Sequence, residues 1–389
     1  MGRFSSFLHS RHWAAFLGLL TLAACANSGE KTFLPVVAKV GAEVKAISSE
    51  EAKTVCLANY CENNQIYVAH FGRHRHDDTP APPAEPSKQP GSGSAPASQP
   101  YVTPPQPAEA LDYSRRILNV QAAWKITEGS PSVLVAVIDS GVDYFHPDLK
   151  SNIADIGYDF YHDHVGAYDD NGHGTHCSGI IAAAKNGIGI RGIAPGVKIL
   201  PVKFLGPDGS GDTADAVKAI DYAVAKGAKI ISNSWGGGGF SQLLDDSIQR
   251  ALNQGVIFVA AAGNNSEDTD SAPDYPANYL GVISVGSSDG SDLKSSFSNY
   301  GKTSVAVFAP GTAILSTYPG GTYKVLSGTS MATPQVAGAL ALALSLKPSI
   351  TRDEATSDLC QSAAPVLSDV SKCGRMDVGA FIQQVSGHL

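Results

Sequence analysis

The sequence predicts an α/β protein in which a mostly parallel sheet carries helices on both faces and a further helix is buried at the centre. The first observation is a series of apolar segments of strand character at 133–140, 198–205, 229–235, 256–263, 282–287 and 304–309. The second is that helical patterns lie between them, at 173–184, 212–225 and 242–253. Such alternation is typical of parallel sheets covered on both faces. The third is residues 336–344, which are apolar on all sides and therefore predict a buried helix.

Length and charge set the first limits on function. The chain has 389 residues, enough for one large domain with additional segments. Its formal net charge is -8 and it contains no basic block, so nucleic acid is not an expected partner. We expect the main domain to be a monomer.

The first 24 residues have the features of an export signal. Arg3 and Arg11 supply a positive start, and the apolar stretch 13–24 is shorter than the ~20 residues of a membrane-spanning helix. The signal ends in Leu-Ala-Ala-Cys, which resembles the bacterial lipoprotein box and predicts a lipid on Cys25. Ordinary secretory cleavage near this point is the alternative. Ala26 follows, and not Asp, which points away from retention in an inner membrane.

Two segments separate this signal from the main domain at 111–389. Residues 25–76 contain a candidate strand at 33–40, a helix start at 48–52 and a second strand at 66–71. Residues 77–110 are rich in Pro, Ser, Gly and Ala, a composition that predicts an extended linker open to proteolysis. We therefore expect an outer-membrane or cell-surface protein, or an extracellular one once the linker is cut.

The cysteines support export. Without Cys25, two close pairs remain that predict disulfides in an oxidising compartment, Cys56–Cys61 and Cys360–Cys373. Cys177 is left as a free thiol. No Cys/His cluster has the spacing of a zinc site.

Three separate motifs carry the chemistry. Ser330 stands at the start of the apolar helix, where free N–H groups favour developing negative charge. Asp139 ends an apolar strand, and His173 opens a Gly-punctuated helical segment. Acyl transfer by serine needs a hydroxyl that attacks, an imidazole that takes and returns its proton, and a carboxylate that orients the imidazole. Asp139 also falls at the carboxyl end of its strand, where sites lie in parallel sheets.

The order Asp139, His173, Ser330, with these flanking residues, resembles the subtilisin-like serine proteases over roughly 110–361. Cys177 after His176 places the resemblance on the thermitase and proteinase K side of that family. It implies a three-layer subtilisin-like fold and an exported serine endopeptidase that cuts protein or peptide substrates through an acyl-enzyme on Ser330. Asn264, after the apolar strand 256–263, matches the family's oxyanion-hole residue.

Two other classes of function are alternatives to a serine endopeptidase. A catalytically silent binding protein on the same fold would typically lack a triad member, and none is missing here. An esterase of α/β-hydrolase type is excluded, because the serine lacks a Gly-x-Ser-x-Gly elbow and the chain order differs. Residues 31–75 are similar to the second half of the family's inhibitory propeptide. A reduced propeptide and a lipoprotein stalk remain alternatives for that segment.

The resemblance also implies a substrate cleft. Its two edges, which pair with an extended peptide, match Ser210, Gly211, Ser234, Trp235 and Gly236. Counting back from Tyr275-Pro276 places Asp274 at the floor of the pocket for the residue before the scissile bond. A carboxylate there favours Lys or Arg in the substrate. A solvated Asp in an acidic loop is the alternative.

Calcium is the cofactor that the resemblance implies. Residues 146–149 and 184–190 match the family's strong calcium site without a gap, and hard oxygen ligands suit Ca2+. The implied ligands are the side chains of Asp148 and Asn186 and the carbonyls of Ala184, Ile188 and Ile190. Asp112 is a candidate for a further acidic ligand. A second site at Asp163, Asp169 and Asp170 is weighed against an ordinary solvated acidic loop.

Overall fold

The computed structural model describes residues 36–40, 43–47, 61–63, 65–69 and 106–389. Its centre is an eight-stranded sheet in the order β14-β13-β12-β10-β5-β8-β6-β7. The seven strands from β14 to β6 pair in parallel, and β7 joins the edge as an antiparallel partner of β6. In that order the strands are Val307–Pro310, Ile283–Ser288, Ile257–Ala261, Ile230–Asn233, Leu134–Asp139, Lys198–Lys203, Tyr158–Asp159 and His164–Val165. The predicted mostly parallel sheet is therefore confirmed.

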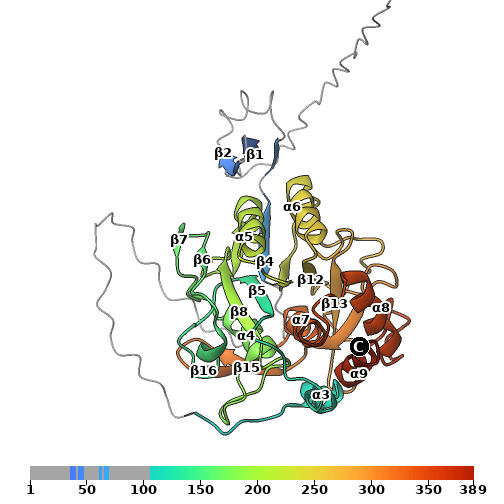
Figure 1. The fold of residues 1–389 in the computed structure, drawn as a ribbon. Coiled ribbons are helices and arrows are strands. Elements are labelled where there is room, and N and C mark those ends of the chain that lie inside the picture. The colour runs from blue at the N-terminus through green and yellow to red at the C-terminus, as the bar shows by residue number, and fades with distance from the viewer. Residues whose placement is uncertain (1–35, 41–42, 48–60, 64, 70–105) are drawn as a thin grey trace, which may run out of the picture. The chain divides into compact units, whose positions relative to one another are not determined.

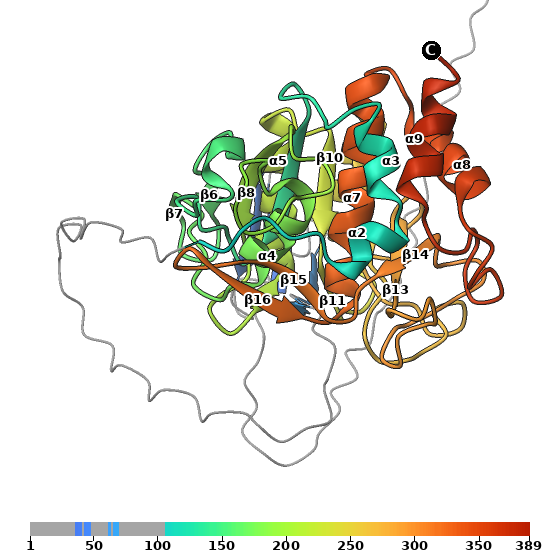
Figure 2. The same ribbon diagram turned by 90° about the horizontal axis from the view of Figure 1, so that it is seen from below.

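Helices cover both faces of this sheet (Figure 1). One face packs against α5 (Thr213–Ala225) and α6 (Gln242–Asn253), and their apolar residues form one core cluster. The other face packs against α4 and α7, and α9 packs against α7, so that these three helices share a second, larger cluster. These helices and their neighbours are α2 (Tyr113–Ile117), α3 (Val120–Trp124), η1 (Lys150–Asn152), α4 (His173–Ala182), α7 (Thr329–Leu346), α8 (Arg352–Ser362) and α9 (Val378–Ser386). Figure 2 shows α3 beside α9, on the outer side of α7.

Helix α7 is the buried central helix that the sequence predicts. It is long and apolar enough to cross a membrane by length and composition, but 89% of its 18-residue window is buried inside the fold. Pro334 lies inside the helix, past its first turn, so its missing N–H leaves the Ser330 carbonyl without its usual helical donor. The Ser234 hydroxyl donates to that carbonyl instead, at 3.0 Å. The contacts of α7 with α4, α9 and the sheet make it the core helix of the domain.

Three small sheets complete the fold. Strands β15 (Ile314–Tyr318) and β16 (Thr322–Leu326) form a hairpin. Strand β4 (Ile66–Ala69) lies between β9 (Ser210–Asp212) and β11 (Trp235–Gly236), and pairs antiparallel with both. In the third sheet β1 lies between β2 and β3, whose bounds are Val36–Val40, Glu43–Ile47 and Cys61–Asn63 for β1, β2 and β3. The candidate strands at 33–40 and 66–71 thus correspond to β1 and β4, whereas the expected helix start at 48–52 lies outside the described residues.

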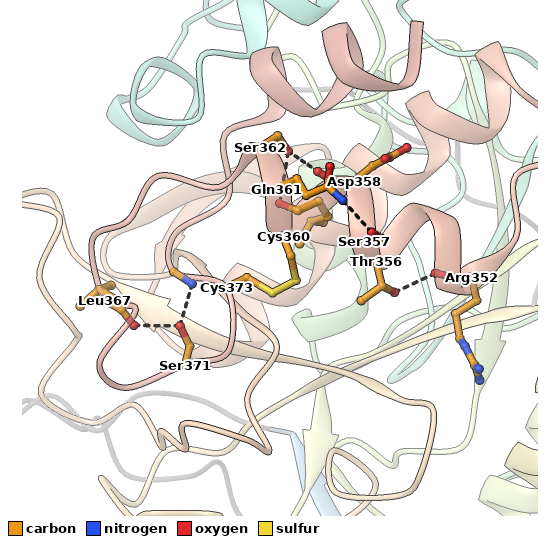
Figure 3. Close-up of a disulfide and its surroundings, with 12 residues drawn as sticks. Arg352, Thr356, Ser357, Asp358, Cys360, Gln361, Ser362, Leu367, Ser371 and Cys373 are labelled. Carbon is orange, nitrogen blue, oxygen red and sulfur yellow. Dashed lines mark hydrogen bonds between the residues drawn. A yellow bond between two sulfur atoms is a disulfide. The ribbon is translucent and has the colours of Figure 1, made fainter. Parts of the chain in front are cut away.

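A disulfide between Cys360 and Cys373 joins α8 to the segment before α9 (Figure 3). The loop it closes is held by Ser371, whose hydroxyl donates to the Leu367 carbonyl at 2.8 Å and accepts from the Gly374 N–H at 3.0 Å. Cys177 is buried and free. Cys56 lies outside the described residues, and so does Cys25.

Candidate active site

Asp139 and His173 form a buried pair. Asp139 is the last residue of β5, and His173 is the first residue of α4, which packs against β5. The Nδ1 atom of His173 lies 2.8 Å and 3.0 Å from the two carboxylate oxygens of Asp139. Oδ1 also accepts the Ser140 N–H at 2.7 Å. The carboxylate therefore fixes the ring with Nδ1 as the donor and Nε2 as the atom available for proton transfer.

The electrostatics of His173 follow from this pairing. Burial alone would lower the pKa of His173, because it disfavours the charged ring, but the adjacent Asp139 carboxylate outweighs it and raises the pKa well above the usual 6.5. Burial raises the pKa of the nearby Cys177 thiol. Cys177 is thus a neutral packing residue and not a nucleophile.

Ser330 is the second residue of α7 and is fully buried. Its hydroxyl donates to the Ser234 carbonyl at 2.8 Å, and the Ser234 hydroxyl donates to the Ser330 carbonyl at 3.0 Å. The Cys177 sulfur lies 3.4 Å from the Ser330 carbonyl oxygen and 4.0 Å from His173 Nδ1, which brings α4 and α7 together at this point. A hydroxyl donates one hydrogen bond at a time, so proton transfer to His173 requires the Ser330 hydroxyl to turn away from Ser234.

Asn264 presents an amide beside the start of α7. It follows β12 after Gly263, whose φ of +105° lies in the left-handed region that favours glycine. The Asn264 Oδ1 atom accepts from both the backbone N–H and the hydroxyl of Thr329, each at 3.0 Å. Its Nδ2 atom is buried and has no hydrogen-bond partner within the described part of the chain. The side chain is therefore held by its oxygen, while its donor is left for a ligand.

The two edges predicted to bind substrate are β9 and β11, and a segment of the same chain lies between them. Ser210 and Gly211 pair with Val68 and Tyr67, and Trp235 and Gly236 pair with Ala69 and Val68. The Ala69 N–H also donates to the Gly209 carbonyl at 3.0 Å. Ser234, which contacts Ser330, comes directly before β11. The strand β4 is thus bound as a peptide would be, by β-augmentation.

Tyr67 is the anchor of β4. It is fully buried, whereas its neighbours Ile66 and Val68 are 44% and 46% exposed. Its ring packs edge-on against Trp235 at 5.2 Å, and Trp235 packs in the same way against Phe204 at 4.7 Å. The indole N–H donates to the Ile138 carbonyl at 2.9 Å, which fixes the Trp235 ring. Sequence reasoning missed Tyr67 as a pocket residue, although the alternation in 66–69 was visible.

Asp274 lies next to the end of β11. It is only 8% exposed, so the alternative of a solvated loop residue is wrong. Its Oδ1 atom accepts from the Gly237 N–H at 3.1 Å, just after β11. A Cβ added at Gly263 would lie 2.7 Å from Asp274 Oδ2, so the carboxylate also reaches the residue before Asn264.

The residues expected to hold calcium come together at the loop 184–190. Asp148 is fully buried, and its Oδ2 atom accepts from the Ile190 N–H at 2.9 Å. Its backbone carbonyl accepts from the Ala184 N–H at 2.8 Å. Asn186 is exposed, and its Oδ1 atom accepts from the Ile188 N–H at 3.1 Å.

The surroundings of the Asp148 carboxylate suit a bound cation. Its Oδ1 atom is buried without a hydrogen-bond partner in the described residues, and burial raises the pKa of the carboxyl to about 6. A carboxylate oxygen left without a donor in a dry position is what a hard cation would satisfy. Tyr323 and Gln106 lie beside it, with the Tyr323 hydroxyl 3.3 Å from Asp148 Oδ2 and 3.0 Å from Gln106 Oε1.

Two expectations about acidic residues are corrected. Asp112 caps α2 and binds Arg115 at 2.7 Å, so it is not a ligand beside Asp148. Asp163, Asp169 and Asp170 do not converge. Asp163 accepts from the Tyr158 hydroxyl, Asp170 binds Lys203 at 2.7 Å, and Asp169 accepts several hydrogen bonds, including two from Thr175.

Composition predicts that residues 106–110 belong to the linker, but in the structure Ala108 and Ala110 pair with the loop that carries the expected calcium ligands. Ala108 and Ala110 form bridges with Ile188 and Ile190. Gln106 therefore belongs to the described domain. Sequence reasoning missed it because the surrounding Pro-rich composition hid it.

A parallel sheet with a carboxylate at one strand end, an imidazole at the next helix start and a serine at the start of the buried helix defines a class of serine endopeptidases. Comparison with known proteins agrees. The model of the Subtilase family matches residues 130–377, and the chain belongs to this family.

Named relatives give the same assignment. The chain is 46% identical over 231 residues to "Thermitase" from Thermoactinomyces vulgaris, which covers 59% of this chain and 81% of that protein. It is 47% identical over 221 residues to "Thermophilic serine proteinase" from Bacillus sp. (strain AK1), covering 57% of this chain and 54% of that protein. It is 42% identical over 264 residues to "Subtilisin NAT" from Bacillus subtilis subsp. natto, and this alignment covers 67% of this chain and 68% of that protein. The predicted membership and its thermitase side are confirmed, and the protein is a serine endopeptidase that acts on protein or peptide substrates.

Proposed function

We propose that this serine endopeptidase works through Ser330 as nucleophile, His173 as general base and then general acid, and Asp139 as the orienting carboxylate. The observation that carries the proposal is the buried contact of His173 Nδ1 with both oxygens of Asp139, at 2.8 and 3.0 Å. It leaves Nε2 as the only ring atom able to accept a proton. Among the described residues, His173 is the imidazole that is itself fully buried and contacts a fully buried carboxylate, whereas His162, His164 and His388 are exposed.

The reaction proceeds in two balanced halves. His173 takes the Ser330 proton as Oγ bonds to the substrate carbonyl carbon, and the carbonyl oxygen becomes an oxyanion. That oxyanion accepts from Asn264 Nδ2 and from the Ser330 backbone N–H, which has no partner within its helix. His173 then returns the proton to the leaving amine as the peptide bond breaks. Water repeats the sequence on the acyl-enzyme and restores Ser330.

Hydrolysis of unfolded casein by purified Ser330→Ala tests this assignment, with Ser132→Ala, at an exposed site, as the matched control. The proposal expects hydrolysis by the wild type and by Ser132→Ala only. Casein left intact by the processed wild type would support the rival class, a silent binding protein on this fold.

We propose further that residues 25–76 act as a reduced propeptide, and not merely as a stalk. Strand β4 fills the gap between β9 and β11, and Tyr67 fills the pocket beside Trp235. While β4 is bound, no other peptide can pair with those edges. The full chain is therefore expected to be latent towards added substrates.

The register of β4 indicates which bond is cut. Ala69, the last residue of β4, pairs with Trp235, and Trp235 directly follows Ser234, whose carbonyl accepts the Ser330 hydroxyl. We place the cleaved bond between His70 and Phe71. Mass spectrometry of the mature N-terminus tests this. A new terminus at Phe71 in the wild type and an uncut chain in Ser330→Ala are expected, whereas a wild-type chain uncut under conditions where it hydrolyses casein would favour the stalk.

In this proposal, Asp274 makes the pocket for the residue before the scissile bond prefer a basic side chain. Its burial and its contact with Gly237, just after the substrate-binding edge β11, support this proposal. A carboxylate that has lost most of its water binds a guanidinium more strongly than an exposed one does. Matched peptides with Arg, Phe or Leu at that position test it, and equal or poorer cleavage after Arg would dismiss it.

The loop 184–190 is proposed to hold a structural Ca2+. Asp148 and Asn186 would provide side-chain oxygens, and Ala184, Ile188 and Ile190 would provide carbonyls, with Gln106 added from the structure. The ion would neutralise the buried Asp148 and fasten 106–110 to the domain.

Export, lipidation at Cys25 and a monomeric state remain proposals from the sequence. The same mass measurement of the mature chain would reveal the lipid, a cut in the linker, or neither.

A further inference from the structure

A cluster of two imidazoles and a carboxylate stands on the hairpin at the edge of the central sheet, away from the site described above. The hairpin consists of β6 and β7, and Asp159 and His164 face each other as a pair across it. His162 belongs to the connecting loop. Ligand atoms from all three residues lie within 4.8 Å of one another.

The carboxylate of Asp159 is the fixed point of this cluster. Its side chain is 3% exposed, and its Oδ1 atom accepts from the His162 backbone N–H at 3.0 Å. Its Oδ2 atom lies 2.8 Å from His162 Nδ1 and 3.8 Å from His164 Nε2. The two imidazoles are 44% and 57% exposed, so an ion can reach them from solvent.

The two rings are arranged alike. They are nearly parallel, with an angle of 10° and 5.9 Å between their centroids, and both turn a nitrogen towards the same carboxylate oxygen. Tyr161 packs edge-on against His162 at 4.9 Å, which limits the motion of that ring. Lys203, which pairs with Asp159 in register, does not neutralise it, because its ammonium binds Asp170 and two carbonyls.

We propose that Asp159, His162 and His164 bind a divalent transition-metal ion of the zinc class, with water completing the coordination. Two imidazole nitrogens and one carboxylate form a ligand set that suits Zn2+ and its first-row neighbours, whereas Ca2+ and Mg2+ prefer oxygen alone. An ordinary His–Asp hydrogen bond explains His162 but leaves unexplained why His164 approaches the same oxygen. Small rotations of the exposed rings bring all three atoms to about 2 Å from one ion.

The position of the cluster sets its effect. Asp159 pairs with Lys203 on β8, and Lys203 pairs with Asp139 on β5, so the ion lies two strands from the catalytic carboxylate and touches no reacting atom. Bound there, the ion fastens the two-residue strands β6 and β7 at the sheet edge. Binding therefore raises thermal stability and leaves peptide hydrolysis unchanged.

The test uses the full chain carrying Ser330→Ala, which prevents self-digestion. After removal of divalent ions, Zn2+ is titrated by calorimetry and the melting temperature is recorded. The same is done for His162→Ala combined with His164→Ala, and for His388→Ala. His388 is a matched control because it is also exposed and lies 3.6 Å from a carboxylate, that of Asp358.

We expect the double variant to lose one Zn2+ equivalent relative to the parent, while His388→Ala keeps it. Saturating Zn2+ should raise the melting temperature of the parent and of His388→Ala by about 5 °C, and that of the double variant by less. Co2+ in place of Zn2+ should give visible absorption that the double variant lacks. Equal Zn2+ stoichiometry in the parent and the double variant overturns the proposal. His162→Gln combined with His164→Gln repeats the comparison if the alanine variant melts early without metal.

Discussion

The two sides of Ser330 differ in how completely their polar groups are satisfied. On the side of α4, both oxygens of Asp139 contact His173 Nδ1, so the carboxylate is paired without a ligand. On the side of β12, Asn264 has a fixed oxygen and a buried donor with no partner in the described chain. A satisfied group is held ready before the reaction, whereas an unsatisfied buried donor indicates where a ligand's charge will lie. The predictions below test this difference, beginning with the largest expected effect.

Disrupting the contact between Asp139 and His173 should lower the activity most. Asp139→Asn keeps the size of the side chain but allows the wrong His173 tautomer, so we expect kcat to fall about 10⁴-fold. Steady-state hydrolysis of a chromogenic peptide measures it, with Asp246→Asn on exposed α6 as control. A loss of less than tenfold would contradict the orienting role.

Removing the amide donor of Asn264 should lower the activity less, and should change kcat and not KM. Asn264→Ala should lower kcat about 10²- to 10³-fold with little change in KM, because the oxyanion exists only along the reaction path. Asn265→Ala, one residue further, is the matched control. Equal effects of the two variants, or a change confined to KM, would remove Asn264 from the oxyanion role.

Activity and local stability should depend on pH in opposite directions. The folded pKa of His173 is raised well above 6.5, so kcat/KM should increase with pH through a midpoint above 6.5 as the ring becomes neutral. The stabilising His173–Asp139 ion pair has the opposite dependence. The ion pair's contribution to the free energy of unfolding is fully present below the pKa that His173 has in the unfolded chain. It is lost as pH rises through the higher pKa that His173 has in the folded protein. A pH–rate profile that is flat above pH 6 would be inconsistent with this environment.

Asp148 Oδ1 is a second buried atom that has no hydrogen-bond partner within the described residues. A bound calcium ion should satisfy this oxygen and so stabilise the fold. After removal of divalent ions, Ca2+ at 100 times its dissociation constant should stabilise the chain by about 2.7 kcal/mol. Asp148→Asn should lose that gain, whereas Asp246→Asn should keep it. Thermal unfolding with and without Ca2+ measures both. An undiminished calcium response in Asp148→Asn would move the ion elsewhere.

The smallest expected effect concerns the anchor of β4. Tyr67→Ala removes the ring that packs on Trp235, so the N-terminal segment should leave the cleft more readily. In the Ser330→Ala background, an added fluorescent peptide inhibitor should bind more tightly to Tyr67→Ala than to Val68→Ala, which changes an exposed neighbour. Unchanged binding would show that β4 does not compete for the cleft.

Local motifs predicted most of the fold and the chemistry. Asp139, His173, Ser330 and Asn264 each stand at the end of an apolar strand or the start of a helix, so their places followed from flanking residues. The placement of β4 did not, because pairing of Tyr67 with Gly211 spans a long loop and depends on tertiary packing. Gln106 was hidden by the Pro-rich composition around it. His162 and His164 carried no familiar spacing, and only the hairpin brings both to Asp159.

Labelling with a fluorophosphonate, followed by mapping of the modified peptide, tests the central claim most directly. The account predicts a single adduct on Ser330 in the active protein, and loss of that adduct in His173→Ala, because the hydroxyl then has no base. An adduct on another residue, or undiminished labelling of Ser330 without His173, would contradict it.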